Sequence, residues 1–335
     1  MGRRPRQLPV TSRSSCSYVL PIAADAAPSA ELTAYVASIG RRCQLVVVDG
    51  SPPDVFAAAH EAWSPHALHV RPDPRHACAM GKVQGVLTGL DHVQHDVVVI
   101  ADDDVRYGSA ELDAVVAALD RADVVVPQNY FDPLPWHARW DTARTLLNRA
   151  SGGDFPGTLG VRTSVLRDAG GYDGDVMFEN LELMRTVEAV GGTCERLDEV
   201  YVRRLPPTTK HFLRQRVRQA YDELARPLRL AVWLLVLPVA LIAGRRWPRT
   251  LPALAAAPVV VAELGRRRGD ARRHFPATSS LLAPLWVAER ATCAWIAIGA
   301  RLRGGIPYRG RRIRCAAHSM ATLRARQATR LRDVA

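Results

Sequence analysis

Three consecutive aspartates follow a strongly apolar short run of the sequence. The run is DVVVIA (96–101), and Asp102, Asp103 and Asp104 come directly after it. At the end of a strand, residues i and i+2 project to the same side, so Asp102 and Asp104 could hold Mg²⁺ or Mn²⁺ together with phosphate oxygens of a substrate. A capping cluster before a turn is the alternative. Because three adjacent like charges repel one another unless a cation compensates, we predict metal ligands at Asp102 and Asp104, and we assign Asp103 to donor binding.

Two further polar positions stand beside predicted strand and helix ends. Asp49 ends the run QLVVV (44–48) and precedes Gly50 and Ser51. Its carboxylate could accept hydrogen bonds from a ribose or base, or it could form an Asx-turn out of the strand. Lys82 follows Gly81 near a predicted helix start, where it could hold an anion, although a solvated lysine is the commoner case.

The second half of the chain offers candidate acids and arginines. Glu179 and Glu182 are three residues apart, which places both on one helical face. A carboxylate beside the apolar pair Met177-Phe178 could act as a general base with a raised pKa, but for Glu182 we expect a surface position. The basic segment 210–218 contains Gln215 and Arg218. Its arginines suit contact with a diphosphate or with anionic lipid.

These residues require a framework of alternating strands and helices. Apolar runs rich in Val and Ile alternate with segments of helical periodicity from residue 18 to residue 127, which predicts a parallel sheet covered on both faces. In such sheets ligands bind at the carboxyl ends of the strands, where Asp49 and Asp102 would lie. The predicted strands are 18–22, 44–48, 67–70, 96–101 and 123–127, and the predicted helices are 29–39, 54–63, 80–90 and 110–119.

The composition changes near residue 226. Three apolar segments follow, 228–244, 251–264 and 280–300, and the last contains Glu289-Arg290. The first two predict a pair of membrane-crossing helices, although seventeen helical residues span about 26 Å, slightly less than a hydrocarbon core of about 30 Å. A charged pair at a bilayer centre costs about 2.5–3.5 kcal/mol per residue on insertion scales, so the third segment is expected to lie in the interface.

Charge and length restrict the class of protein further. The chain has 335 residues and a formal net charge of +12. Because its arginines flank the apolar runs, an anionic membrane surface is the expected partner, and no nucleic acid. The expected organisation is a disordered basic leader (1–16) without a signal peptide, an α/β domain (17–225), membrane-associated helices (226–315) and a basic tail (316–335). The six cysteines show no metal-ligand spacing, which indicates reduced thiols facing the cytosol.

With these residues placed, the chain resembles glycosyltransferase family 2, and especially its ceramide glucosyltransferase-like branch. The similar segments occur in the family's order from about residue 18 to residue 312. They are VLPIAADA with Pro21 and Asp25, VVVDGS with Asp49, MGKVQGVLTGL with Lys82, ADDDVRY, GTLGVRTSVLRDAGGYD, FENLEL, LRQRVRQ with Gln215 and Arg218, and GGIPYRGRRIR.

The resemblance implies a GT-A fold, an α/β doubly wound and mostly parallel sheet, with C-terminal membrane-associated helices. It implies inverting transfer from a nucleotide diphosphate sugar, often a UDP-sugar, to a membrane lipid or lipid-linked acceptor, with Mn²⁺ or Mg²⁺. By the same resemblance Pro21, Asp25, Asp49, Lys82, Asp102, Asp103, Gln215 and Arg218 contact the donor. The catalytic domain is expected on the cytoplasmic side of the plasma membrane.

One departure from the family pattern leaves the catalytic base open. The family's base falls at Asn180, and an amide cannot accept the proton of an acceptor hydroxyl. Either Glu179 or Glu182 replaces it, or the protein is a catalytically degenerate, membrane-bound scaffold. A sugar-nucleotidyltransferase is a third possibility, but such enzymes need a Gly-rich loop where this chain has AADAAP.

Overall fold

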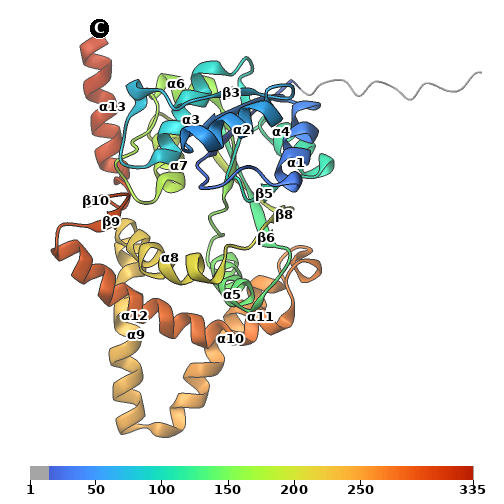
Figure 1. Ribbon diagram of the computed structural model, residues 1–335. Coiled ribbons are helices and arrows are strands. Elements are labelled where there is room, and N and C mark those ends of the chain that lie inside the picture. Colours follow the sequence, from blue (N-terminus) through green and yellow to red (C-terminus); the bar gives the residue numbers. More distant parts are fainter. Residues whose placement is uncertain (1–14, 335) are drawn as a thin grey trace, which may run out of the picture.

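The computed structural model describes residues 15–334, and Figure 1 shows a sheet-containing body with a layer of helices below it. The predicted leader, 1–16, lies outside the described residues except for Ser15 and Cys16. Cys16 is fully buried, and its Sγ lies 2.6 Å from that of Cys43. Cys16 therefore belongs to the core and not to the predicted leader, and all six cysteines are free thiols.

Eight strands form one mixed sheet in the order β3-β2-β1-β4-β7-β6-β8-β5. Strands β1, β2, β3 and β4 are parallel, as are β6 and β8, whereas β7 runs antiparallel between β4 and β6, and β5 runs antiparallel to β8. The predicted, mostly parallel sheet is confirmed. The strands are β1 Ser17–Ile22, β2 Gln44–Asp49, β3 Leu68–Val70, β4 Val97–Ala101, β5 Val105–Arg106, β6 Val124–Phe131, β7 Thr158–Arg162 and β8 Cys194–Arg204.

Helices cover both faces of this sheet, so buried apolar residues form one cluster on each side. Helix α1 begins after Ser29, whose hydroxyl accepts a hydrogen bond from the Leu32 amide, as the sequence predicts. Helix α3 approaches β1 closely because Gly89 faces it, and a Cβ there would lie 2.5 Å from Val19. These helices are α1 Ala30–Gly40, α2 Pro53–Trp63, α3 Gly81–His92, α4 Ser109–Ala118, α6 Thr163–Asp168 and α7 Glu179–Ala189.

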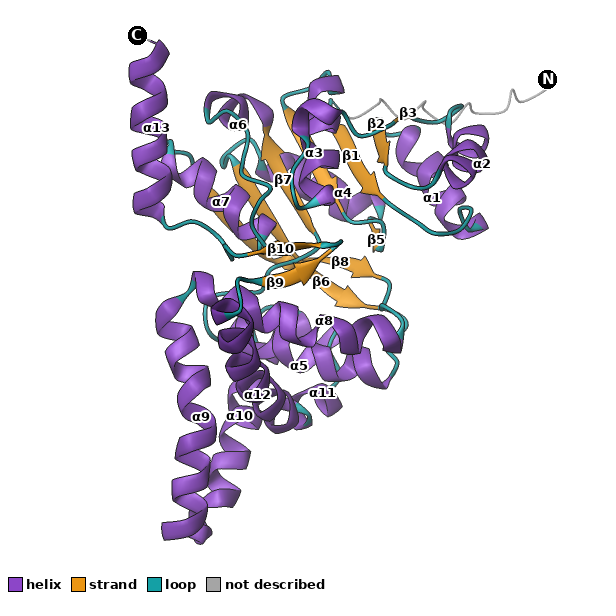
Figure 2. Ribbon diagram, turned by 60° about the vertical axis from the view of Figure 1, so that its left-hand side comes forward, coloured by secondary structure: helices purple, strands orange, loops and turns teal. Residues whose placement is uncertain are grey.

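A second, all-helical layer lies below the sheet in Figures 1 and 2. Its apolar contacts join Leu146 and Leu147 to Phe275 and Trp286. It comprises α5 Trp136–Ala150, α8 Thr209–Tyr221, the 3₁₀ turn η2 Asp222–Ala225, α9 Pro227–Arg246, α10 Leu251–Arg266, α11 Ala277–Leu281 and α12 Ala283–Leu302.

Helices α9 and α10 project away from the rest of the molecule as a hairpin (Figure 1). Among the described residues only α9 is long and apolar enough to cross a membrane, and 11% of its most apolar window is buried. Helix α10 has 16 residues, about 24 Å, and its Gly265 packs on the α5 backbone. The predicted second crossing helix therefore falls short in length, although leucines and valines remain exposed on both arms.

The segment predicted as one interfacial helix, 280–300, is broken between Leu281 and Ala283 into α11 and α12. Its charged pair does not face outward, because Arg290 is 2% exposed and Glu289 lies 3.7 Å from Arg216. The charges that argued against crossing thus contact the rest of the protein, while Trp295 and Ile296 of α12 are exposed.

The C-terminal segment returns to the sheet-containing body. Strands β9 Ile306–Tyr308 and β10 Arg311–Ile313 form a small antiparallel hairpin, and α13 Met320–Val334 lies beside α7. Between them, the amide and the Nδ1 of His318 lie 2.7 and 2.8 Å from the two carboxylate oxygens of Glu182. The expectation that Glu182 is a surface acid is wrong: it is fully buried, because the tail covers its helix.

Candidate functional site

Two adjoining cavities lie at the carboxyl ends of β1, β2 and β4. The first, here the sheet-end cavity, is lined by Pro21, Gly50, Arg71, Lys82 and Asp103, and by Tyr308 and Arg309 of the β9–β10 hairpin. The second, here the interlayer cavity, lies between the sheet and the helical layer. Its lining includes Asp102, Glu179, Asn180, Gln215, Arg218, Asp222, Glu223, Arg226, Arg229, Trp286 and Arg290.

Lys82 stands at the boundary of the two cavities. Its Nζ lies 2.6 Å from Asp102 Oδ1 and 2.9 Å from Glu179 Oε1. Burial lowers the pKa of Lys82, but the charges of Asp102 and Glu179 outweigh burial and hold that pKa well above its usual value. Lys82 is therefore a fixed cation, and the alternative of a freely solvated lysine is wrong.

Asp102 and Asp104 point toward a common partner, although they lie after the end of β4, in a turn closed by the Val105 amide and the Asp102 carbonyl, and not on the extended strand that the prediction assumed. The Nε of Arg204 donates to both oxygens of Asp104, at 3.0 and 2.9 Å, and its Nη2 donates to Asp102 Oδ2 at 3.2 Å. Burial raises the pKa of Asp104, against the opposing charge of Arg204. Burial and the neighbouring carboxylates raise the pKa of Asp103 to about 6. Arg204 comes from the end of β8, and no local sequence signal connects it to residue 102.

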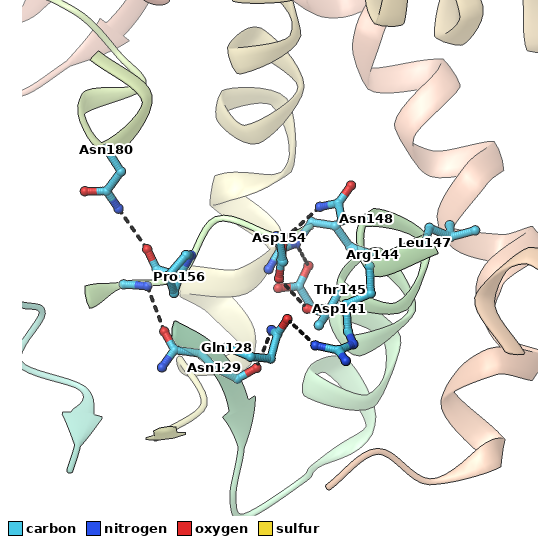
Figure 3. A network of polar contacts seen from close by, with 12 residues as sticks. Gln128, Asn129, Asp141, Arg144, Thr145, Leu147, Asn148, Asp154, Pro156 and Asn180 are labelled. Carbon is cyan, nitrogen blue, oxygen red and sulfur yellow. Dashed lines mark hydrogen bonds and ion pairs between the residues drawn. The ribbon is translucent and has the colours of Figure 1, made fainter. Parts of the chain in front are cut away.

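The loop 154–157 lies beside this acidic cluster, and Figure 3 shows the polar contacts of Asp154 and Pro156 in it. The amide of Asp102 donates to the Gly157 carbonyl at 2.8 Å, and the amide of Gly157 donates to Asn129 Oδ1 at 2.8 Å. At the other end of the loop, Asp154 accepts hydrogen bonds from Arg144, Thr145 and Asn148 of α5. The loop is thus held from the sheet and from the helical layer at once.

The three candidate bases lie in different environments. Asn180 donates from Nδ2 to the Pro156 carbonyl at 2.8 Å, so it helps to hold the loop (Figure 3). Glu179 lines the interlayer cavity and pairs with Lys82. Glu182 does not line that cavity and is occupied by His318. Among the three, only Glu179 offers a carboxylate to the cavity.

The remaining predicted donor contacts divide between the cavities and their surroundings. Pro21 lines the sheet-end cavity, and Gln215 and Arg218 line the interlayer cavity. Asp25 is exposed and outside both linings. Asp49 is buried and forms the Asx-turn: Oδ1 accepts from the Ser51 amide, and Oδ2 lies 3.1 Å from His69 Nε2.

Two lining residues cannot be assigned a role from sequence. Asp222, in η2, has its Oδ1 buried without a hydrogen-bond partner among the described residues, and burial together with the nearby Glu179 raises its pKa well above the usual value. Tyr308 lies under the Arg218 guanidinium, 4.6 Å from it. The segment GGIPYRGRRIR, which contains Tyr308, shows a family similarity in sequence, but that similarity indicates no contact with Arg218.

Comparison with known proteins finds a family and a fold. Residues 29–167 match the model of glycosyl transferase family 2. The structure resembles the mannosyltransferase PcManGT from Pyrobaculum calidifontis, solved with GDP-Man and Mn²⁺, with a TM-score of 0.51 and 16% identity over 88% of this chain and 91% of that one. It also resembles mannosyl-3-phosphoglycerate synthase from Rubrobacter xylanophilus, with a TM-score of 0.44 and 15% identity over 64% of this chain and 74% of that one. No curated protein matches the sequence.

Proposed function

Because the chain carries a glycosyltransferase family 2 domain with the GT-A fold, we propose that it transfers a sugar, with inversion, from a nucleoside diphosphate sugar to a lipid or lipid-linked acceptor. The observation that carries this proposal is the Lys82–Asp102 ion pair at the boundary of two cavities. A donor whose nucleotide fills the sheet-end cavity would place its diphosphate beside Lys82 and its sugar in the interlayer cavity. By resemblance to the family, the donor is a UDP-sugar.

Cationic side chains surround the proposed diphosphate position. Lys82 and Arg218 flank it, and Arg309 lines the sheet-end cavity. Charge developing on the departing diphosphate is stabilised by cations that are already fixed in place. Lys82 is fixed by its two carboxylate partners, and Arg218 by its contact with Tyr308.

The aspartate pair fits a hard divalent cation. Asp102 and Asp104 offer carboxylate oxygens that converge on one point, where the Arg204 guanidinium lies in this structure. Mn²⁺ or Mg²⁺ takes such ligands and completes its shell with phosphate oxygens; when bound, it would neutralise charge on the diphosphate. Since Arg204 occupies the point of convergence, metal binding requires this side chain to move or to share the carboxylates.

Glu179 is the proposed base. Its carboxylate would take the proton of the acceptor hydroxyl while the hydroxyl oxygen attacks C1 of the sugar and the bond from C1 to the diphosphate breaks. Because its Oε1 pairs with Lys82 at 2.9 Å, Glu179 can accept that proton only when Lys82 turns toward the donor phosphates. If Lys82 stays on Glu179, the protein is the degenerate scaffold that Asn180 allows.

Activity and binding measurements separate these possibilities. Membranes containing the protein are incubated with a panel of radiolabelled nucleotide-sugars, and lipids are extracted; we expect label in the lipid fraction for one donor. Titration calorimetry of the purified chain with UDP in Mn²⁺ should show binding. Absence of UDP binding would contradict the transferase proposal and favour the scaffold.

We also propose a membrane arrangement for the helical hairpin. The exposed apolar arms of α9 and α10 would insert as a hairpin from the cytoplasmic face of the plasma membrane, with the loop that contains Trp247 at the far side. Single-cysteine variants in intact cells test this: a cysteine at Trp247 should react with an impermeant maleimide, and one at Tyr308 should not. Labelling at Tyr308 without lysis would overturn the topology.

A further inference from the structure

The helix-side half of the interlayer cavity contains an excess of buried hydrogen-bond donors. Six donor nitrogens on its lining residues are buried and lack a hydrogen-bond partner within residues 15–334: Arg218 Nε, Arg226 Nε, Arg229 Nε, Trp286 Nε1, and Nε and Nη1 of Arg290. Three acceptors on the same lining are likewise unpartnered: Gln219 Oε1, Asp222 Oδ1 and Glu223 Oε2. The protein therefore supplies twice as many free donors as free acceptors to this space.

Arg290 is the strongest member of the set. Its side chain is 2% exposed and stacks on Trp286, with the guanidinium carbon 4.9 Å from the ring centroid. The pKa of Arg290 is lowered by burial, which the nearby Glu223 and Glu289 offset only in part. A buried guanidinium without a paired anion is costly, so this position is suited to an external anion.

The neighbouring arginines share one internal carboxylate. Glu223 Oε2 lies 3.2 Å from Arg226 Nη2 and 3.3 Å from Arg229 Nε, without hydrogen-bond geometry at this oxygen. Arg229 also donates to Asn148. Glu223 thus pairs with Arg226 and Arg229, whereas Arg290 has no carboxylate of the described residues within ion-pair distance, although Asp222 and Glu289 lie near it.

We propose that Arg226, Arg229 and Arg290 form a binding site for a phosphate group carried by the acceptor. Arginine forks match phosphate oxygens bidentately, and a phosphate offers only acceptors at neutral pH apart from one exchangeable proton. The proposal rests on the proposed function and narrows its acceptor class to phosphate-bearing molecules.

The surroundings of the site indicate that the phosphate belongs to a lipid. Arg226 and Arg229 stand at the first turn of α9, and Leu228 between them is 87% exposed. The exposed apolar surface of α9 begins at that turn and continues through Val232 and Leu235. A phosphate held by the arginines would place an attached hydrocarbon chain along this surface.

The test uses the purified full-length chain in detergent and titrates four probes by calorimetry: farnesyl phosphate, farnesol, inorganic phosphate and UDP with Mn²⁺. We expect farnesyl phosphate to bind, inorganic phosphate to bind more weakly and farnesol not to bind. Arg290→Gln should lower the affinity for farnesyl phosphate by about 10- to 100-fold, because charge-assisted hydrogen bonds are lost. It should leave the affinity for UDP unchanged. Arg273→Gln is the matched control, because that side chain is 78% exposed.

Stability separates a binding role from a structural one. If the partner of Arg290 is an external anion, Arg290→Gln should not lower the thermal midpoint of the ligand-free protein. A sharply destabilised or unfolded Arg290→Gln would overturn the assignment of Arg290, and normal farnesyl phosphate binding by Arg226→Gln would then overturn the site. Equal binding of farnesol and farnesyl phosphate would also refute it. Loss of UDP affinity in Arg290→Gln would instead assign the arginine to the donor, whereas failure of the wild type to bind UDP would reject the transferase proposal itself.

Discussion

Arg204 holds the position at which the two aspartates converge, so its removal should change metal affinity. Replacing Arg204 by Met keeps much of the side-chain length and removes three hydrogen bonds: two to Asp104, at 2.9 and 3.0 Å, and one to Asp102, at 3.2 Å. In the wild type a metal must compete with these hydrogen bonds. In Arg204→Met the carboxylates are left without that cation and repel one another.

The expected size of the effect follows from the strength of these three hydrogen bonds. A hydrogen bond to a charged group contributes about 1.5–3 kcal/mol. Because the three side chains keep between 21 and 28% of their surface exposed, solvent weakens these bonds, and we expect the three together to contribute only about 1.5 kcal/mol. Every 1.4 kcal/mol is about tenfold in affinity, so Mn²⁺ should bind Arg204→Met about 10-fold more tightly. The thermal midpoint of the variant should fall in EDTA and recover in excess Mn²⁺, since a ligand at about 100 times its Kd stabilises by about 2.7 kcal/mol.

Electron paramagnetic resonance of free Mn²⁺, on EDTA-stripped protein without nucleotide, measures this affinity directly. The control is Arg203→Met, because Arg203 is adjacent on β8, alternates to the other side of the strand and pairs with Asp132. It should leave Mn²⁺ affinity unchanged. Unaltered or weaker Mn²⁺ binding by Arg204→Met would refute the assignment of Asp102 and Asp104 as metal ligands.

Two further variants test the base and the helical layer. Glu179→Gln should lower kcat by about 10²–10⁴ with little change in donor affinity, whereas Glu182→Gln should lower stability and leave kcat near wild type; the opposite result would exchange their roles. Asp141→Asn should lower the free energy of unfolding by about 3–5 kcal/mol, because Arg216, whose Nη1 lies 2.9 Å from Asp141 Oδ1 and whose side chain is 7% exposed, loses its charged partner. As a control, Asp113→Asn at the exposed pair with Arg42 should lower it by less than about 1 kcal/mol. Burial raises the pKa of Asp141, but the charges of the paired arginines outweigh burial and hold this pKa well below its usual value. The ionised carboxylate therefore stabilises the fold fully above the unfolded-state pKa of about 3.9, and this stabilisation is lost as the pH falls below that value. In chemical denaturation, the difference in stability between wild type and Asp141→Asn should be smaller at about pH 3 than at about pH 7.

The elements that local patterns determine were predictable. Every strand and helix expected between residues 18 and 127 is present, with ends displaced by at most a few residues, because apolar runs and caps such as Ser29 act within a few positions. The strand repeat predicted that Asp102 and Asp104 share a side, but β4 ends at Ala101, and the turn that follows brings them together. The partners of these carboxylates were not predictable, since Lys82, Glu179 and Arg204 come from distant segments.

The predictions that were wrong or incomplete concern tertiary contacts. Glu182 was expected on the surface of its helix, but His318 of the C-terminal segment packs on it and buries it. Glu289-Arg290 lies in the middle of an apolar segment. Composition alone could not tell whether this charged pair faces the rest of the protein or the outside. For Asp49 the sequence left a ligand contact and an Asx-turn open; the structure shows the turn, and His69, which occupies the second oxygen, comes from a segment that the local pattern does not connect to it.

The helical layer is structurally part of the site and not merely an attachment to it. Arg149 of α5 donates to the carbonyls of Gly265 and Arg268, at the end of α10. The preceding residue of α5, Asn148, holds Asp154 of the loop beside Asp102 and accepts from Arg229 of α9. A displacement of the hairpin therefore acts, through a single helix, on the loop whose Gly157 carbonyl accepts from the Asp102 amide. An acceptor phosphate bound by Arg229, as proposed above, would contact a side chain that donates to Asn148 of α5. Because Asn148 also holds Asp154, we expect acceptor binding to affect the Asp102 cluster through α5 and the loop.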